Sequence, residues 1–173
     1  MTNPKKPTLN DQAAGPVYKA EGTRPISVAD FTNRIIAAAF KHRWEPIFGK
    51  WVSEAQRGFI QGRSMLDNVI ELEHSMMENA LTEKNPMAVL IDFRAAFPSV
   101  SHEYMHKTLE AIGLPRAALH VVKNFYDGGK CSLVFAGGRW RGFDMGAGIR
   151  QGCPLAPITF SVVMDILLRR IKE

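Results

Sequence analysis

Glycine and proline residues divide this 173-residue chain into short elements, and this division limits the folds that the chain can adopt. The clearest breaks are Asn85-Pro86, the pair Gly113 and Pro115, and the pair Pro154 and Pro157. Both residue types interrupt regular backbone hydrogen bonding, so we expect helices and strands to begin or end there. Between the breaks lie segments with helical spacing and short apolar runs typical of strands. Their order predicts an α+β, or mixed α/β, fold.

The composition is that of a folded, mildly basic protein. Hydrophobic residues make up 46% of the chain and charged residues 23%, which is close to the average for globular domains. Two cysteines are too few for a disulfide scaffold or a cysteine-rich zinc module. The first residues are polar and lack the apolar stretch of a secretory signal, and the apolar runs are too short to span a bilayer. We therefore expect an intracellular protein, with no preference between nucleus and cytoplasm.

The net charge of +5 is unevenly distributed along the chain. Residues 1–63 carry ten Lys or Arg and five Asp or Glu, and residues 84–173 carry twelve and seven, so each segment has a net charge of +5. Residues 64–83 carry five acids and no base. This middle segment is typical of a helix with one solvated acidic face. The basic segments are compatible with a nucleic-acid partner, but charge alone identifies none.

Apolar residues at helical spacing predict several helices. In the first, Ser27 and Asp30 resemble a capping box, and Pro46 and Gly49 close the helix. Ser64 caps a second helix, which has apolar residues on one face and the acids on the other. The remaining helices are predicted over about 102–112, over about 115–126, and in the C-terminal segment that Pro154 and Pro157 open.

Two regions of the sequence predict strands. Met87–Ile91 is an apolar run between a turn and Asp92, which is typical of a buried strand. Cys131–Phe135 and Trp140–Phe143 flank Gly137-Gly138, a combination that favours a β-hairpin. The first strand would carry Asp92 at its carboxyl end, where a buried carboxylate must be paired or must bind a cation. Taken alone, Asp92 favours a capping or turn role over a metal ligand.

Two loops carry further candidate binding residues. Gly146–Pro157 contains three glycines and two prolines, which favour an irregular loop that lets a ligand approach the backbone. Its glycine spacing departs from the dinucleotide-binding fingerprint by one residue. Gln56–Ser64 places Arg57 and Arg63 on a glycine-bearing loop, where planar guanidinium groups can contact phosphate oxygens. A solvated loop is the alternative for this segment.

Residues His102–His106 fit the pattern His-Glu-x-x-His of zinc peptidases. On a helix, both imidazoles would lie on one face, but a catalytic zinc site also needs a third ligand. The extended form of the motif requires glycine and histidine where this chain has Leu109 and Ile112. A zinc peptidase is therefore a minor alternative to a solvated helix face.

The order of four blocks is more specific than any one of them. They are Arg24-Pro-Ile-Ser27, Gln56-x-Gly-Phe-x-x-Gly-Arg-Ser64, Asp92-Phe-x-Ala-Ala-Phe97 and Gly148-Ile-Arg-Gln-Gly-Cys-Pro-Leu-x-Pro157, and Phe160 follows the last. In this order they resemble successive blocks of reverse transcriptases, above all those of the non-LTR (LINE-type) retrotransposon and group II intron kind. The resemblance covers about residues 24–170.

The resemblance implies a right-hand polymerase fold with fingers and a partial palm. Residues 1–23 would be a flexible lead-in, residues 24–86 a fingers-like helical part and residues 87–173 a partial palm. The family's aromatic block often continues with aspartate, where this chain has Pro98, and its later block carries adjacent aspartates, whereas this chain has no Asp-Asp pair. We therefore expect an N-terminal fragment of the catalytic domain, with an incomplete palm sheet and no primer extension by itself.

The resemblance also implies a metal site. Asp92 and the carbonyl of Phe93 would be ligands of two Mg²⁺ ions, for which oxygen ligands are suitable. Paired metals lower the pKa of a primer 3′-hydroxyl and neutralise the charge that develops as it attacks the α-phosphate. With one of the family's carboxylates present, the metal site of this chain is expected to be incomplete.

The nucleotide site is implied in the same way. Phe97 matches the aromatic residue that leaves no room for a ribose 2′-hydroxyl, and Gln151 and Gly152 match the block that contacts the incoming nucleotide and the template. Arg63, and less closely Arg57, fall in the block whose cations hold the triphosphate. The implied partners are an RNA template, a DNA primer and deoxynucleoside triphosphates, with no membrane partner. A non-catalytic nucleic-acid-binding remnant is the alternative function.

Overall fold

The structure is a computed structural model that describes residues 2–4, 9–11, 15–17, 23–25, 28–83, 85–135 and 137–172. Its helices are α1 (Phe31–Trp51), α2 (Met65–Thr82), α3 (Ala96–Ser99), α4 (His102–Ala111), α5 (Arg116–Tyr126) and α6 (Ala156–Lys172). Its strands are β1 (Thr2–Pro4), β2 (Leu9–Asp11), β3 (Gly15–Val17), β4 (Thr23–Pro25), β5 (Lys130–Phe135) and β6 (Gly138–Asp144). The strands form three antiparallel pairs, β1 with β4, β2 with β3 and β5 with β6.

The described chain therefore combines helices with small antiparallel sheets, as the α+β prediction requires. The lead-in predicted over residues 1–23 lies partly outside the described residues, and its described parts are β1, β2, β3 and the first residue of β4. Ser27, the first residue of the predicted capping box, also lies outside the described residues. Within the described ranges, no helix is long and apolar enough to cross a membrane.

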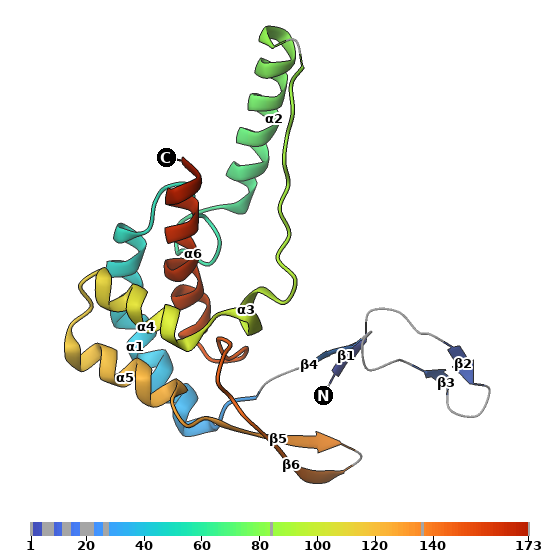
Figure 1. The fold of residues 1–173 in the computed structure, drawn as a ribbon, viewed down its shortest axis with the longest axis vertical. Coiled ribbons are helices and arrows are strands. Elements are labelled where there is room, and N and C mark those ends of the chain that lie inside the picture. The colour runs from blue at the N-terminus through green and yellow to red at the C-terminus, as the bar shows by residue number, and fades with distance from the viewer. Residues whose placement is uncertain are drawn as a thin grey trace.

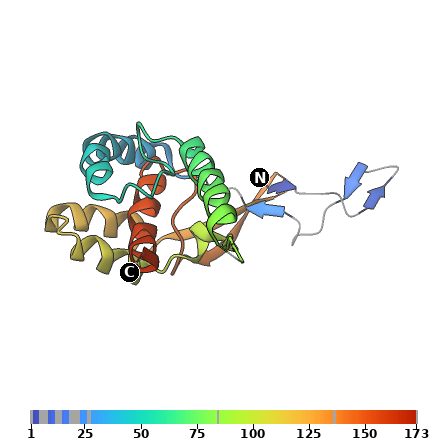
Figure 2. The same cartoon turned by 90° about the horizontal axis from the view of Figure 1, so that it is seen from above.

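The hydrophobic core lies between α1, α4, α5 and α6, which are grouped together in both views of the chain (Figure 1, Figure 2). Each of these helices contributes side chains that are at most 3% exposed: Ala37 and Phe48 from α1, Met105 from α4, Val122 from α5 and Ile158 from α6. We call this group of helices the helical core. In contrast, α2 reaches away from it and has no buried residue (Figure 1).

Helix α1 begins where the sequence predicts but ends later. Asp30 caps it, because the carboxylate accepts a hydrogen bond of 2.9 Å from a backbone N–H of the first turn. The prediction that Pro46 and Gly49 close the helix is wrong, since α1 continues to Trp51. Proline removes one backbone donor. However, the rings of Trp44 and Phe48 pack with their centroids 6.2 Å apart across this turn, and this packing supports the helix beyond the proline.

Most of the other predicted elements are confirmed. Ser64 caps α2, with its hydroxyl accepting a hydrogen bond of 3.2 Å from Leu66 N. Helices α4 and α5 match the predicted ranges, and α6 begins between the two prolines that were expected to open it. The predicted hairpin is β5 and β6, which join at Gly137, where φ is +75°.

The prediction of a buried strand over Met87–Ile91 is wrong. Within this segment Val89 is 70% exposed and Leu90 is 81% exposed, and the segment forms no strand. An apolar run becomes a buried strand only when a neighbouring backbone pairs with it and a layer covers its face. No described strand of this chain pairs with it. It runs as an extended connection from the far end of α2 back to α3 (Figure 1).

Candidate functional site

Two sequence blocks run side by side where α3 leads into α4. The backbone N–H of Ile149 donates to the carbonyl of Phe97 at 2.8 Å, and that of Gly148 donates to the carbonyl of Val100 at 2.7 Å. We call these paired segments, residues 97–101 and 147–149, the seam. Gly148 has φ +96°, and a Cβ there would lie 3.1 Å from backbone atoms of Pro98. The close approach of the two segments therefore requires glycine at this position.

An aromatic cluster joins three of the predicted blocks. The ring of Phe97 stacks on Phe160 with centroids 4.2 Å apart and an interplanar angle of 14°. The ring of Phe59 packs edge-on against Phe97, with centroids 5.9 Å apart. The hydroxyl of Ser161 adds a hydrogen bond of 2.7 Å to the carbonyl of Gly58. Segments near residues 58, 97 and 160 thus converge on one half-buried ring, Phe97.

Backbone conformation is unusual at two positions of this region. Phe59 has φ +60° and Ala95 has φ +53°, and these are the residues other than glycine with positive φ in the described part of the chain. The left-handed region costs an L-residue about 1–2 kcal/mol. Ala95 immediately precedes α3, a short helix that the sequence did not predict, and the turn there aims Phe97 at Phe160.

Arg63 binds the end of α1. Its Nη2 donates to the carbonyls of Gly49 and Val52 at 2.8 and 3.0 Å, and its Nη1 donates to the carbonyl of Gln56 at 2.7 Å and to that of Ser53. The last carbonyls of a helix have no partner within the helix, and a cation there also complements the helix dipole. The guanidinium group therefore caps α1 and holds the loop that follows it.

Arg57 links the same loop to α2. Its Nη1 donates to Asn68 Oδ1 at 3.0 Å, and its Nη2 pairs with the Glu71 carboxylate. The hydrogen bond with Glu71 raises the pKa of the Arg57 guanidinium. Both arginines predicted to hold a triphosphate are thus engaged with groups of the chain itself.

Gln151 and Gly152 are exposed on the loop before α6. Gly152 has φ +87°, so it forms a turn that a residue with a side chain would adopt only under strain. Arg150 lies beside them, with its guanidinium carbon 5.8 Å from the centre of the Tyr126 ring. The seam brings this loop next to Phe97, so Phe97 and Gln151 lie on neighbouring segments.

The metal-binding potential of the site rests on Asp92, which is exposed and precedes Phe93. Among the described residues, no three His, Cys, Asp or Glu side chains gather where they could bind a metal ion. Reverse-transcriptase-type chemistry with two Mg²⁺ ions requires several oxygen ligands. The described residues therefore do not fit a complete two-metal site.

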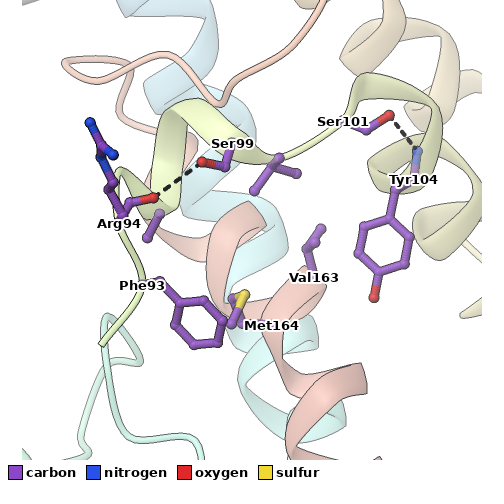
Figure 3. Close-up of a pocket in the computed structure, with 9 residues that line it drawn as sticks. Phe93, Arg94, Ser99, Ser101, Tyr104, Val163 and Met164 are labelled. Carbon is purple, nitrogen blue, oxygen red and sulfur yellow. Dashed lines mark hydrogen bonds between the residues drawn. The ribbon is translucent and has the colours of Figure 1, made fainter. Parts of the chain in front are cut away.

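A cavity of about 430 Å³ lies beside this segment. Phe93, Val163 and Met164 face one another across it, and Tyr104 lies at its far side, whereas the side chain of Arg94 points away (Figure 3). Its walls come from the connection before α3, from α4 and from α6. The sequence pattern could not reveal it, because residues 93–104 meet Val163 and Met164, which lie far away along the chain.

A buried carboxylate that the sequence analysis missed joins α6 to the end of α1. Asp165 is 0% exposed and accepts hydrogen bonds of 3.1 Å from Ser53 N to each of its oxygens. Arg169, four residues further along α6, pairs with it at 2.8 Å and lies over the ring of Trp51 at 4.6 Å. The spacing of Asp165 and Arg169 predicts a helical ion pair, but nothing local indicates Ser53.

The His-Glu-x-x-His pattern lies on α4, as the sequence predicts. The Nε2 atom of His102 contacts the carbonyl of Gly148 at 3.0 Å, and the ring centroids of His102 and His106 are 6.5 Å apart. Glu103 is exposed and pairs with Lys107 at 2.7 Å. Burial lowers the pKa of His106. The first histidine and the glutamate are therefore engaged in other contacts.

One protein family matches almost the whole chain. Residues 4–173 match the family described as reverse transcriptase (RNA-dependent DNA polymerase). The chain belongs to the reverse transcriptase family. This agrees with the blocks that converge on Phe97, each of which resembles a block of that family.

Similar proteins place this reverse transcriptase domain among those of the non-LTR retrotransposon kind. The chain is 32% identical over 156 residues to the retrovirus-related Pol polyprotein from type-2 retrotransposable element R2DM of Drosophila melanogaster, covering 87% of the chain and 14% of that protein. It is 30% identical over 178 residues to the Pol polyprotein from type-1 retrotransposable element R2 of Nasonia vitripennis, covering 98% of the chain and 16% of that protein. The chain thus spans a small part of the length of these relatives.

Proposed function

We propose that this chain supplies nucleotide- and template-contacting parts of an RNA-directed DNA polymerase, which adds deoxynucleotides to a primer 3′ end. The observation that carries this proposal is the convergence of the three blocks on Phe97. Residues that act on one nucleotide must lie together in space, and the seam supports this arrangement because it joins the segment of Phe97 to the loop that contains Gln151. In this assignment, residues 24–86 form the fingers-like part and residues 87–173 a partial palm.

In this proposal Phe97 is the ring beneath the sugar of the incoming nucleotide. A ring there excludes a 2′-hydroxyl and so favours deoxynucleotides. Its stacking on Phe160 supports this role, because a ring held on one face can act as a fixed wall. Gln151 and Gly152 contact the nucleotide and the template from the neighbouring loop, where both are exposed.

Asp92 and the carbonyl of Phe93 are proposed as ligands of Mg²⁺, which the family generally uses. Bound metal would activate the primer hydroxyl and stabilise the phosphate charge. Since the described residues offer an incomplete ligand set, we derive no catalytic step for them. We expect the isolated chain to bind nucleic acid without extending a primer.

The roles of Arg57 and Arg63 as triphosphate ligands stay predictions. Arg63 donates to four backbone carbonyls, so a phosphate contact would compete with the cap of α1. Arg57 is engaged with Asn68 and Glu71 in α2, and a phosphate would have to displace them. The remaining basic residues are proposed to follow template and primer phosphates without reading sequence.

The test measures, by fluorescence anisotropy, how tightly the chain binds a labelled oligo(dT)·poly(rA) hybrid at increasing salt concentrations. We expect the affinity to fall as salt rises, because neutralised phosphates release counterions. Gln151→Ala should weaken binding, whereas Asn79→Ala, which changes an exposed amide side chain of α2, should not. An affinity that does not change with salt would contradict the proposal.

Primer extension separates the polymerase from the non-catalytic nucleic-acid-binding alternative. With Mg²⁺, dTTP and the same hybrid, we expect no extension by the isolated chain. Extension that is lost in Asp92→Ala would overturn this expectation and show that the chain completes a metal site. The zinc peptidase alternative has no observation in its favour, given the contacts of His102 and Glu103.

A further inference from the structure

His102 joins α4 to the loop that contains Gln151. It is the first residue of α4 and is 8% exposed. Its Nε2 lies 3.0 Å from the carbonyl oxygen of Gly148. A carbonyl oxygen can only accept a hydrogen bond, so Nε2 carries a proton and donates it. The contact therefore fixes which ring nitrogen is protonated in the neutral form of this imidazole.

This hydrogen bond completes the seam. The N–H of Gly148 donates to the carbonyl of Val100, and the N–H of Ile149 donates to the carbonyl of Phe97. The His102 side chain binds the remaining polar backbone group of Gly148, its carbonyl. Both polar groups of this glycine are thus engaged at the point where the loop turns toward Gln151.

The imidazole is itself held in place by α5. The ring of His102 packs against Tyr126 with centroids 5.3 Å apart, and Tyr126 is 1% exposed. Arg150 approaches the same tyrosine ring at 5.8 Å. Space around Arg150 is limited, because a Cβ on Gly129 would lie 2.5 Å from its Nη2. One buried tyrosine therefore supports both His102 and the residue next to Gln151.

We propose that His102 is a positioning residue that holds the loop of residues 148–152 against Phe97 and so sets the place of Gln151. The contact of Gln151 with nucleic acid rests on the proposed function. The hydrogen bond between His102 and Gly148 does not, because it lies within this chain. The proposal gives the first histidine of the His-Glu-x-x-His pattern a role that requires no zinc. The nitrogen that would bind a metal from this side is occupied by the carbonyl of Gly148.

The experiment compares the wild-type chain with three variants. His102→Leu removes the donor, and His102→Gln retains an N–H donor at a similar reach. The matched control is His120→Leu, at an exposed histidine of α5. Amide hydrogen exchange of Gly148 and Ile149 is measured by NMR, with the amide of Val122 as a reference for the helical core. A long-range ¹H–¹⁵N spectrum of the wild-type chain shows which nitrogen of His102 carries the proton.

We expect His102→Leu to accelerate exchange at Gly148 and Ile149 by about tenfold, the size of one lost hydrogen bond. Exchange at Val122 should change less, His102→Gln should restore most of the protection, and His120→Leu should match the wild type. Unchanged loop exchange in His102→Leu, or an equal rise at Val122, would overturn the proposal. So would a wild-type ring whose Nε2 is unprotonated, a result that does not depend on any variant folding.

Hybrid binding by the same proteins separates this proposal from the proposed function. If the wild-type chain does not bind the oligo(dT)·poly(rA) hybrid, the proposed function fails, and the exchange data still decide the role of His102. If the wild-type chain binds, we expect His102→Leu to weaken binding by roughly threefold to tenfold, and His102→Gln to restore it. Equal affinities of the wild type and His102→Leu would show that the hydrogen bond does not place Gln151.

Discussion

The helical core and the α2 region both carry apolar residues at helical spacing, but they differ in burial. Helices α1, α4, α5 and α6 share one core, in which Met105, Val122 and Ile158 are at most 1% exposed. Helix α2 has no buried residue, and in the connection that follows it Leu90 is 81% exposed. Apolar periodicity determines which element a segment can form. Burial depends in addition on a partner surface, which in the helical core comes from segments far apart in the chain.

The same comparison holds for polar groups. Around the helical core, Arg63, Asp165 and His102 each bind backbone groups of another segment. In α2, the polar contacts with another segment join side chains instead, from Arg57 on the preceding loop to Asn68 and Glu71. The two regions should therefore respond differently to equivalent substitutions.

Two methionines provide the largest expected contrast. Met105 in α4 is 0% exposed, and Met77 in α2 is 60% exposed. Met105→Ala should lower the free energy of unfolding by about 2–5 kcal/mol, because it leaves a cavity in the core. Met77→Ala should change it by less than about 0.5 kcal/mol. Urea denaturation followed by tryptophan fluorescence measures both. A similar loss in the two variants would show that α2 is packed as well as α4.

The arginine caps provide the next contrast. Arg63→Ala should lower the free energy of unfolding by about 2–3 kcal/mol, because part-buried carbonyls at the end of α1 lose a charged donor. Arg57→Ala should have a smaller effect on global unfolding but should increase amide exchange in α2, which it ties to the loop. If Arg63→Ala proves as stable as Arg57→Ala, the capping role of Arg63 is wrong.

A smaller effect concerns pH. Burial lowers the pKa of His106 below its ordinary value of 6.5, even though Asp127 acts in the opposite direction. The unfolded chain then binds a proton more readily than the folded chain, so stability falls as the pH falls through about 6.5. His106→Gln should reduce the loss of stability between pH 7.5 and pH 5.5, while His120→Gln, at an exposed site, should leave it unchanged. An undiminished loss in His106→Gln would argue against this burial effect.

The sequence predicted the helix caps and turns, which depend on nearby residues. Ser64, Gly113 and Gly137 mark element ends that the structure confirms, because caps and turns involve only neighbouring groups. The sequence misplaced the end of α1, since the packing of Trp44 and Phe48 outweighs the effect of Pro46.

Predictions that depend on distant residues were less complete. Met87–Ile91 has the composition of a buried strand, but the chain folds without a described partner for it. The order of the blocks indicated the family, and the proposal that Phe97 and Gln151 act on one nucleotide rests on it. The order of the blocks could not indicate that Arg63 caps α1 or that His102 binds Gly148, because those contacts follow from the tertiary fold.

The distribution of charge leads to the most direct test of where this chain binds nucleic acid. Helix α2 lies within the acidic segment of residues 64–83, whereas the loops that converge on Phe97 carry Arg57, Arg63 and Arg150. A hybrid whose template contains 4-thiouridine can be cross-linked to the chain by light, and the attached peptides identified by mass spectrometry. If nucleic acid binds at the loops around Phe97, we expect cross-links in residues 56–64 and 146–157 and few in α2. Cross-links that concentrate on α2, or that are spread evenly over the chain, would contradict this expectation.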